Sequence, residues 1–455
     1  MKRSSQNAAA DAVFTTMPVP RAYFSLALPV VLGMVVSLVY NLTDTWFIAQ
    51  TGSTELVAGV SLCAPLFTLM VAFGDVFGLG GSTAISRLLG QKRDEEAEHM
   101  SAFCLYAAVV FGAATGAVLL LFQNQILVLL GAEADTLPYA RDYYLILAGG
   151  SPFIILNIVP NNLLRTEGLA KEAMFCTIAG SLVNIVLDPI LIFSAGMGAG
   201  GAALATLISN AAGDALFFIV ICKKARHITI LPGRARITGH AFWEILSIGI
   251  PASLTNIMQS LAVLLTNRLL LPYGTDQVAA YGIAMKVNLI CTLIMVGAAF
   301  GAQPLLGYSY GAGAEKRLSA LIRFDILTEL VISAVFVTVS FGAAPAVVRL
   351  FMKDPAIVSA GTAILRAAMI SQPAVGVVLV CTTLFQAEGR ALPAFVLSLA
   401  RQGFVLWICL AVFSRAAGLP GILYSQALSD GLTLLVSLAF LRGSGRRRTK
   451  IPEAQ

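Results

Sequence analysis

Twelve long apolar segments dominate this chain of 455 residues. A helix needs about 20 mostly apolar residues to cross the hydrocarbon core of a bilayer. Hydrophobic residues make up 58% of the chain and charged residues 12%, against about 25% charged residues in a typical soluble domain. The sequence therefore predicts an all-α integral membrane protein with twelve transmembrane helices. The segments cover approximately residues 22–49, 56–82, 100–122, 138–163, 171–195, 199–222, 241–271, 278–308, 319–342, 361–386, 392–414 and 419–441.

Lysine and arginine residues are distributed unevenly between the two sides of these segments. With both termini placed on one side, that side carries 22 of the 30 Lys and Arg residues and the opposite side carries six. The 22 include Arg87 in the basic stretch after the second span and Arg165 in the one after the fourth. Positively charged loops face the cytoplasm, so we expect a multi-pass protein of the bacterial inner membrane with both termini cytoplasmic. Basic loops that face anionic lipid account for the net charge of +6, and we expect no nucleic-acid partner.

The two halves of the sequence resemble each other at a fixed offset. Gly90 corresponds to Gly311, and Gly168 corresponds to Gly389, each pair 221 residues apart. Six spans per half predict two six-helix lobes related by a parallel internal repeat, a design that places a substrate cavity between the lobes. The predicted parts are a cytoplasmic tail (1–21), the N-terminal lobe (22–222), a basic linker (223–240), the C-terminal lobe (241–441) and a basic tail (442–455).

Polar groups inside the N-terminal lobe are the strongest functional signal. Asp188 lies in the apolar run NIVLDPILIF, and a charged residue at the centre of a membrane helix costs about 2.5–3.5 kcal/mol on insertion scales. Asp44, Asn184 and Thr206 belong to three spans of this lobe and are expected at the same depth as Asp188. Carboxylate, amide and hydroxyl oxygens suit a hard cation, or a proton shared by two carboxylates.

Two prolines accompany these polar residues. Pro189 directly follows Asp188, and Pro29 precedes Asp44 in the first span. Each ring removes a backbone hydrogen bond and loosens one turn of its helix. The sequence predicts bends at both positions and leaves open whether either bend takes part in switching.

The chain resembles the multidrug and toxic compound extrusion (MATE) family of secondary exporters over about residues 20 to 440. The resemblance is carried by the six-plus-six plan, by YNLTDTWFI in the first span, by GLGGSTAISRLLGQ after the second, and by NIVLDPILIF. It implies a V-shaped pair of lobes that expels lipophilic, often cationic compounds in exchange for H⁺ or Na⁺. By the same resemblance, Asp44 is the essential acid of the first span, and Asn184, Asp188 and Thr206 are the cation site.

The resemblance also implies that Tyr40 and Tyr143 line the cavity of this lobe, and that Pro29 kinks when the acid of the first span is protonated. The predicted substrate cavity comprises Tyr40, Asn41, Tyr143, Asn157 and Asn210. One branch of the family carries an acid in the seventh span, whereas this chain has none there beyond Glu244 at its cytoplasmic end. Coupling is therefore expected in the N-terminal lobe alone. Four other acids, Asp75, Asp214, Glu329 and Asp430, are interpreted as local hydrogen-bonding or ion-pair partners, with Lys286 and Arg401 as candidate counter-charges.

Several other function classes find little support. The sequence has no phosphate-binding GxxxxGK[ST] loop, no CxxC, and only three histidines, so we predict neither an enzyme nor a protein with a resident cofactor. The expected partners are a small lipophilic or cationic substrate and the lipid bilayer, and the protein is expected to be monomeric. A flippase for a lipid-linked precursor remains the alternative, although it would need a more cationic cavity. A channel is disfavoured by the duplication.

Overall fold

The computed structural model describes residues 11–448, with side chains described to residue 443. Residues 1–10 and 449–455, which belong to the two predicted tails, lie outside the described part. The described chain is almost entirely helical. Its longer helices are α2 (Val19–Ala49), α3 (Thr54–Leu62), α4 (Ala64–Gly90), α5 (Asp94–Leu121), α7 (Leu137–Thr166), α8 (Ala170–Pro189), α9 (Gly198–Lys224), α10 (Gly239–Leu270), α11 (Thr275–Gly311), α12 (Glu315–Arg349), α13 (Pro355–Ile370), α14 (Gln372–Ala387), α15 (Ala391–Gln402) and α16 (Phe404–Arg448).

The number of membrane spans agrees with the sequence pattern once one long segment is resolved. Among the described residues, ten helical segments are long and apolar enough to cross a membrane, and the bent pair α13–α14 makes an eleventh. One of the ten, Ala391–Gly443, is 53 residues long. It reverses at Gly418, whose backbone is not helical (φ 61°, ψ −132°). Ser429 beyond the reversal donates a hydrogen bond to the Arg401 carbonyl at 3.1 Å, so the segment contains two spans and residues 11–448 contain twelve.

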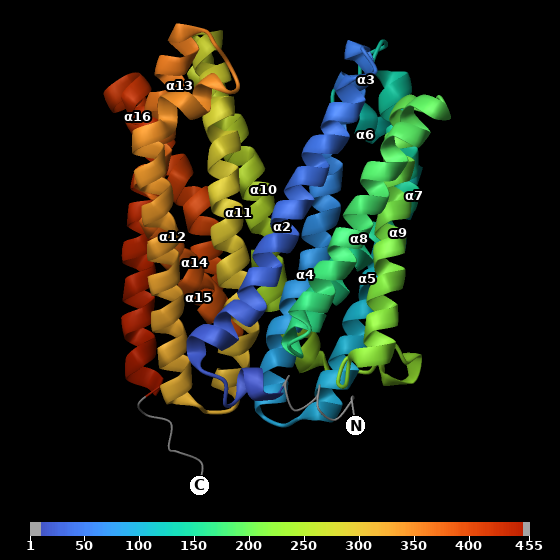
Figure 1. The fold of residues 1–455 in the computed structure, drawn as a ribbon, viewed down its shortest axis with the longest axis vertical. Helices are drawn as coiled ribbons and strands as arrows, with labels where there is room; N and C mark the ends of the chain where they lie inside the picture. Colours follow the sequence, from blue (N-terminus) through green and yellow to red (C-terminus); the bar gives the residue numbers. More distant parts are fainter. Residues whose placement is uncertain (1–10, 449–455) are drawn as a thin grey trace.

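The helices form two lobes (Figure 1). α2 to α9, including the short α6 (Gln123–Leu129), make the N lobe, and α10 to α16 make the C lobe. The two lobes diverge away from the end at which α2 begins and α16 ends. At that end, which we call the closed end, Gly90 of α4 meets Gly311 of α11. A Cβ atom on Gly90 would lie 2.2 Å from the Tyr308 carbonyl oxygen, and one on Gly311 would lie 2.2 Å from the Arg87 carbonyl oxygen. The two repeat-related glycines therefore allow the lobes to approach backbone to backbone.

Arg87 connects the lobes beside these glycines. Its guanidinium forms an ion pair with Glu244 of α10 and donates hydrogen bonds to the carbonyl oxygens of Gln386 (3.1 Å) and Ala387 (2.9 Å) at the end of α14. The side chain is only 7% exposed. The sequence pattern assigned Arg87 to the basic residues after the second span, whereas the structure buries it between the lobes. A buried arginine that satisfies several acceptors fixes the orientation of both elements.

The segment before α2 packs against the protein. Val13 and Phe14 are buried in a cluster with Leu306 and Leu318 of the C lobe. Arg317 donates to the carbonyl oxygens of Met17 and Val13 at 2.9 and 2.8 Å. Two residues of the predicted cytoplasmic tail are thus covered by protein, because the apolar side chains of Val13 and Phe14 pack on the closed end of the C lobe.

The predicted linker is ordered along the N lobe. α9 ends at Lys224 and α10 begins at Gly239, close to the expected bounds of 223–240. The carboxylate of Glu167, at the end of α7, accepts backbone N–H groups from Arg226 and Ile228, each at 2.9 Å. Such bonds hold the start of the linker against the N lobe.

Candidate functional site

The two acids predicted to act together lie against each other in the N lobe. Asp44 is near the end of α2 and Asp188 is near the end of α8, and their carboxyl groups are within hydrogen-bonding range. Asp188 is fully buried, and Asp44 is half-buried. Neither Asp44 Oδ1 nor Asp188 Oδ2 accepts a hydrogen bond from an N–H or hydroxyl group of the described residues. An ionised carboxylate is an acceptor only, so a bond between these two groups requires a proton on one of them.

The predicted partners gather around this pair. Asn184 is completely buried one turn before Asp188 and donates to its Oδ1 at 3.4 Å. Thr206 of α9 is also buried. α9 crosses α8 closely where Gly201 meets Leu191 and where Gly180 meets Ser209. Those two crossings place Thr206 level with the Asn184–Asp188 turn, as the span depths predict.

Two tyrosines complete the polar surroundings of the acids. Tyr40 of α2 and Tyr143 of α7 both lie close enough to interact electrostatically with Asp44 and Asp188. Tyr143 is buried and Tyr40 is half-buried. The structure thus brings together residues from four helices at one level of the N lobe.

The backbone after Asp188 departs from the α-helix. α8 ends at Pro189, and a π-helical turn follows over Ile190–Ser194. Pro189 has no N–H group, so the Ile185 carbonyl loses its helical donor. π turns inside helices are frequent at functional sites, and this one ends the helix that carries the buried acid. In α2, by contrast, Pro29 lies inside a helix that continues over Val19–Ala49.

Asn157 and Asn210 lie in a second polar cluster of the N lobe. Asn157 of α7 donates to Asp214 Oδ1 at 3.0 Å and to the Asn210 carbonyl at 3.3 Å. Asn210 itself donates to the Thr206 carbonyl at 2.8 Å. The interpretation of Asp214 as a partner across helices is confirmed, and Asn157 connects α7 to α9 through these hydrogen bonds.

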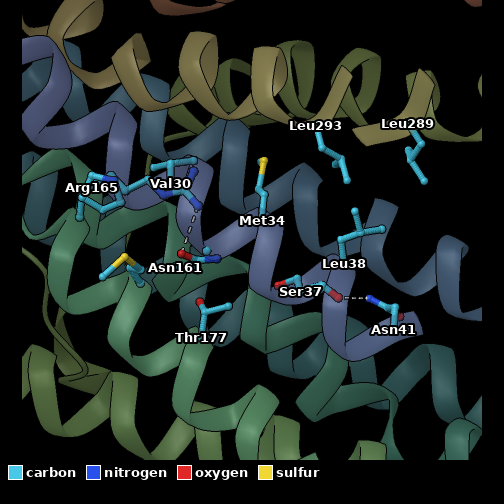
Figure 2. Close-up of a pocket in the computed structure, with 14 residues that line it drawn as sticks. Val30, Met34, Ser37, Leu38, Asn41, Asn161, Arg165, Thr177, Leu289 and Leu293 are labelled. Atoms are coloured by element: carbon cyan, nitrogen blue, oxygen red, sulfur yellow. Dashed lines mark hydrogen bonds between the residues drawn. The ribbon is translucent and has the colours of Figure 1, made fainter. Parts of the chain in front are cut away.

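A cavity of about 390 Å³ lies between the lobes (Figure 2). One of the predicted cavity residues, Asn41, lines this cavity, and its amide donates to the Ser37 carbonyl at 2.7 Å. The other four lie outside the lining: Tyr40, Tyr143, Asn157 and Asn210. Pro29 also borders it. The C lobe contributes apolar side chains from α11. The remaining lining comprises Val30, Gly33, Met34, Ser37, Leu38, Asn161, Arg165, Ala170, Met174, Thr177, Leu289 and Leu293.

Among the described residues that line the cavity, one is a cation, Arg165, which sequence reasoning assigned to a basic loop. Its guanidinium points into the lining and donates to Asn161 Oδ1 at 3.1 Å (Figure 2). It also lies close enough to interact with Asp75 of α4, which accepts a hydrogen bond from Asn256 of the C lobe at 3.3 Å. The counter-charge of Asp75 is thus Arg165, not Lys286 or Arg401. The missed signal was the sequence NNLLR, which places two amides three and four residues before the arginine on one helix face.

The deep acids of the C lobe differ from one another. Asp430 accepts hydrogen bonds from Ser371 (2.7 Å) and Gln426 (3.1 Å) and lies near Arg401, which confirms its interpretation as a local partner. Glu329 has no such partner: both of its carboxyl oxygens are buried and accept no hydrogen bond from the described residues. The expectation that Glu329 is a local hydrogen-bonding partner was therefore wrong, because the surrounding helices offer it no donor.

The fold and both halves of the sequence match known transporters. The MatE family model matches residues 29–190 and again residues 251–412, an offset close to that of the glycine pairs. Among curated proteins, the chain is 33% identical over 434 residues to the multidrug export protein MepA of Staphylococcus haemolyticus, covering 95% of each chain. It is 31% identical to MepA of Staphylococcus aureus over 425 residues, covering 93% of this chain and 94% of the relative.

Solved structures show the same two-lobed arrangement. An outward-facing multidrug resistance transporter of the MATE family superposes with a TM-score of 0.89 at 25% identity, covering 96% of this chain and 98% of the other.

Proposed function

Because the chain belongs to the MATE family, we propose that it exports lipophilic, often cationic compounds from the cell in exchange for a coupling ion. The family match and the apolar spans make it a multi-pass membrane transporter. The excess of basic residues on the side of the termini supports a cytoplasmic location for both ends. The closed end is then cytoplasmic, and the arrangement in Figure 1 is outward-facing.

We propose H⁺ as the coupling ion, and the observation that carries this is the Asp44–Asp188 pair. Two carboxyl groups in mutual hydrogen-bonding range hold one proton between them and can take up a second. Substrate and protons then compete for the same negative charge, which is the requirement for antiport by alternating access. Asn184 donates a hydrogen bond to Asp188, and no cation of the described residues forms an ion pair with either acid.

Na⁺ is the second candidate, and the oxygen donors around Asp188 support it. The side-chain oxygens of Asp44, Asn184, Asp188 and Thr206 are hard ligands of the kind that alkali and alkaline-earth cations select. The Ile185 carbonyl, freed by Pro189, would add a further donor.

The experiment that separates these ions is efflux of a lipophilic cationic dye from proteoliposomes. A pH gradient that drives efflux without Na⁺ supports the proton, and a Na⁺ gradient at equal pH on both sides supports sodium. If neither gradient drives efflux, the antiport proposal fails. The flippase alternative then gains weight, since Arg165 is available in the cavity for an anionic group. Translocation of a fluorescent lipid pyrophosphate in the same vesicles would test it.

A further inference from the structure

Two buried acids lie together in the C lobe, far from the N-lobe site. Asp325 and Glu329 are one turn apart on the same face of α12, and both side chains are 0% exposed. No lysine, arginine or histidine of the described residues forms an ion pair with either of them. Asp325 Oδ2 and both carboxyl oxygens of Glu329 also have no hydrogen-bond partner in the described part of the chain.

The group that covers this pair comes from the other lobe. The Tyr23 hydroxyl, on the first turns of α2, donates to Asp325 Oδ1 at 2.9 Å. Tyr23 is fully buried, and its ring packs edge-on against Phe324, with ring centroids 5.2 Å apart. This contact joins the N lobe to the C lobe near the closed end. From α14, the Cys381 thiol also lies close enough to interact with Asp325.

Glu329 lies one turn deeper, in a space that a glycine leaves free. A Cβ atom on Gly376 of α14 would lie 3.0 Å from the Glu329 Cβ and 3.4 Å from Glu329 Oε2. The Met295 methyl group of α11 lies 3.1 Å from that same position. The Glu329 carboxyl group therefore lies near apolar groups of α11 and α14.

A negative charge at this position would be very costly. A buried carboxylate without a counter-ion or donor is strongly disfavoured, and such a group takes up a proton instead. Asp325 receives one hydrogen bond from Tyr23, whereas Glu329 receives none, so Glu329 is the better proton holder of the two. The pair is therefore neutral or singly charged whenever Tyr23 covers it.

We propose that Asp325 and Glu329 form a second proton-binding site, and that the lobes can close at the cytoplasmic end only when this site holds a proton. The inference rests on the proposed alternating-access function and its orientation. When the lobes part at this end, Tyr23 withdraws from Asp325 and water reaches the pair. The acids then equilibrate with the cytoplasm and ionise. Closure desolvates them again and requires the proton to return.

The ligand chemistry favours a proton over a metal cation. The pair offers two carboxyl groups and one hydroxyl, and both acids lie inside α12, whose backbone carbonyls accept helical hydrogen bonds. Among the described residues, no group of three or more His, Cys, Asp or Glu converges as a metal site. A Na⁺ ion would lack most of its ligands, while a proton needs neither a cavity nor a coordination shell.

The site gives the conformational equilibrium a definite dependence on pH. The outward-facing form binds the proton more tightly than the inward-open form, so acid favours closure of the cytoplasmic end and alkali favours its opening. The test is a distance between spin labels on the outer ends of the lobes. Leu129→Cys and Leu350→Cys suit the labels, since both residues are 84% exposed. Cys222, the exposed native cysteine of the described chain, is replaced by serine.

The measurement uses full-length protein in lipid nanodiscs, with Asp44→Asn and Asp188→Asn to silence the N-lobe acids. We expect the long, outward-open distance at acid pH and a shorter distance at alkaline pH. Glu329→Gln mimics the protonated acid, so the long distance should persist to higher pH, with the midpoint raised by at least about one pH unit. Tyr23→Phe weakens the closed contact and should move the midpoint the other way, to lower pH.

Asp430→Asn is the matched control, because Asp430 is equally buried but has Ser371 and Gln426 as partners. It should leave the midpoint unchanged. The proposal is overturned if the label distance changes with pH in the same way after Glu329→Gln. It is also overturned if this pH dependence is already lost when only the N-lobe acids are replaced. If Glu329→Gln does not fold, Tyr23→Phe decides alone, and an unmoved midpoint in that variant counts against the site. If the wild-type protein showed no gradient-driven dye efflux, while the label distance still changed with pH in a Glu329-dependent way, the proposed antiport would be refuted and this second site would stand.

Discussion

The carboxyl groups of Asp44 and Asp188 lie within hydrogen-bonding range although they belong to different helices, α2 and α8. Asn184 adds a donor to Asp188, and no cation of the described residues pairs with either acid. Two carboxylates at this separation cannot both ionise without strong repulsion. Because one carboxyl group belongs to α2 and the other to α8, a proton that binds to the pair affects both helices.

Asp44→Asn and Asp188→Asn should each abolish gradient-driven efflux, lowering the initial rate by more than about tenfold. The amide keeps the size of the side chain but cannot exchange a proton. Efflux of a cationic dye from proteoliposomes, normalised to reconstituted protein, measures the effect. Asp276→Asn, at an exposed acid in the first turn of α11, is the control and should pump normally. Wild-type rates in both N-lobe variants would eliminate the coupling role of the pair.

Binding of a cationic substrate should weaken as the pH falls. Below the midpoint of the pair, its second proton removes the remaining negative charge, so affinity drops by up to about tenfold per pH unit. The apparent midpoint belongs to the pair and not to either residue. Fluorescence polarisation of a dye bound to detergent-solubilised protein, between about pH 5 and pH 8, reads this out. In Asp188→Asn the curve should flatten; a flat curve in the wild type would contradict the idea.

Pro29→Ala should slow transport more than it weakens binding. The proline lies inside α2 and borders the central cavity, and its ring leaves the Ser25 carbonyl without a helical donor. Alanine restores that bond and favours one helix geometry by about 1–3 kcal/mol, a shift of roughly 5- to 150-fold. Dye binding in detergent and efflux in vesicles, measured on the same variant, separate the two effects. Unchanged efflux would show that Pro29 takes no part in switching between helix geometries.

Gly90→Ala should prevent the lobes from closing normally. The added methyl group would meet the Tyr308 carbonyl oxygen at 2.2 Å, and overpacking of this kind costs about 1–3 kcal/mol. The label distance described above should shift toward the inward-open value, and efflux should fall. Gly149→Ala is the matched control, because a Cβ atom there meets nothing within 4 Å. Equal behaviour of the two variants would show that the Gly90–Gly311 contact does not limit closure.

Much of the fold could be predicted from the sequence because membrane insertion leaves few options. A backbone in hydrocarbon must satisfy its own hydrogen bonds, so each apolar run of about 20 residues becomes a helix. The offset between Gly90 and Gly311 predicted the two lobes, and the structure adds that these glycines touch. The level of Asp44, Asn184, Asp188 and Thr206 followed from span depth alone, since helix rise is constant.

Other features depend on which helix faces lie opposite each other, and sequence periodicity contains no such information. Arg165 and Arg87 were assigned to basic loops, yet both have their guanidinium groups inside the protein, at the cavity and between the lobes. Asn157 was expected in the cavity and instead binds Asp214. Long side chains near a helix end can point toward either solvent or protein, and only the neighbouring helices decide the direction.

The sequence by itself determined that this chain is a membrane protein of two repeated lobes with acids inside the first, because hydropathy, charge bias and internal similarity are local properties that survive any packing. Only the tertiary structure decided that Tyr23 of one lobe covers Asp325 of the other, and that, within the described part of the chain, Glu329 has no hydrogen-bond partner while Asp430 has two. Whether a buried acid is satisfied depends on donors that come from distant parts of the chain, and those meet only when the helices are packed.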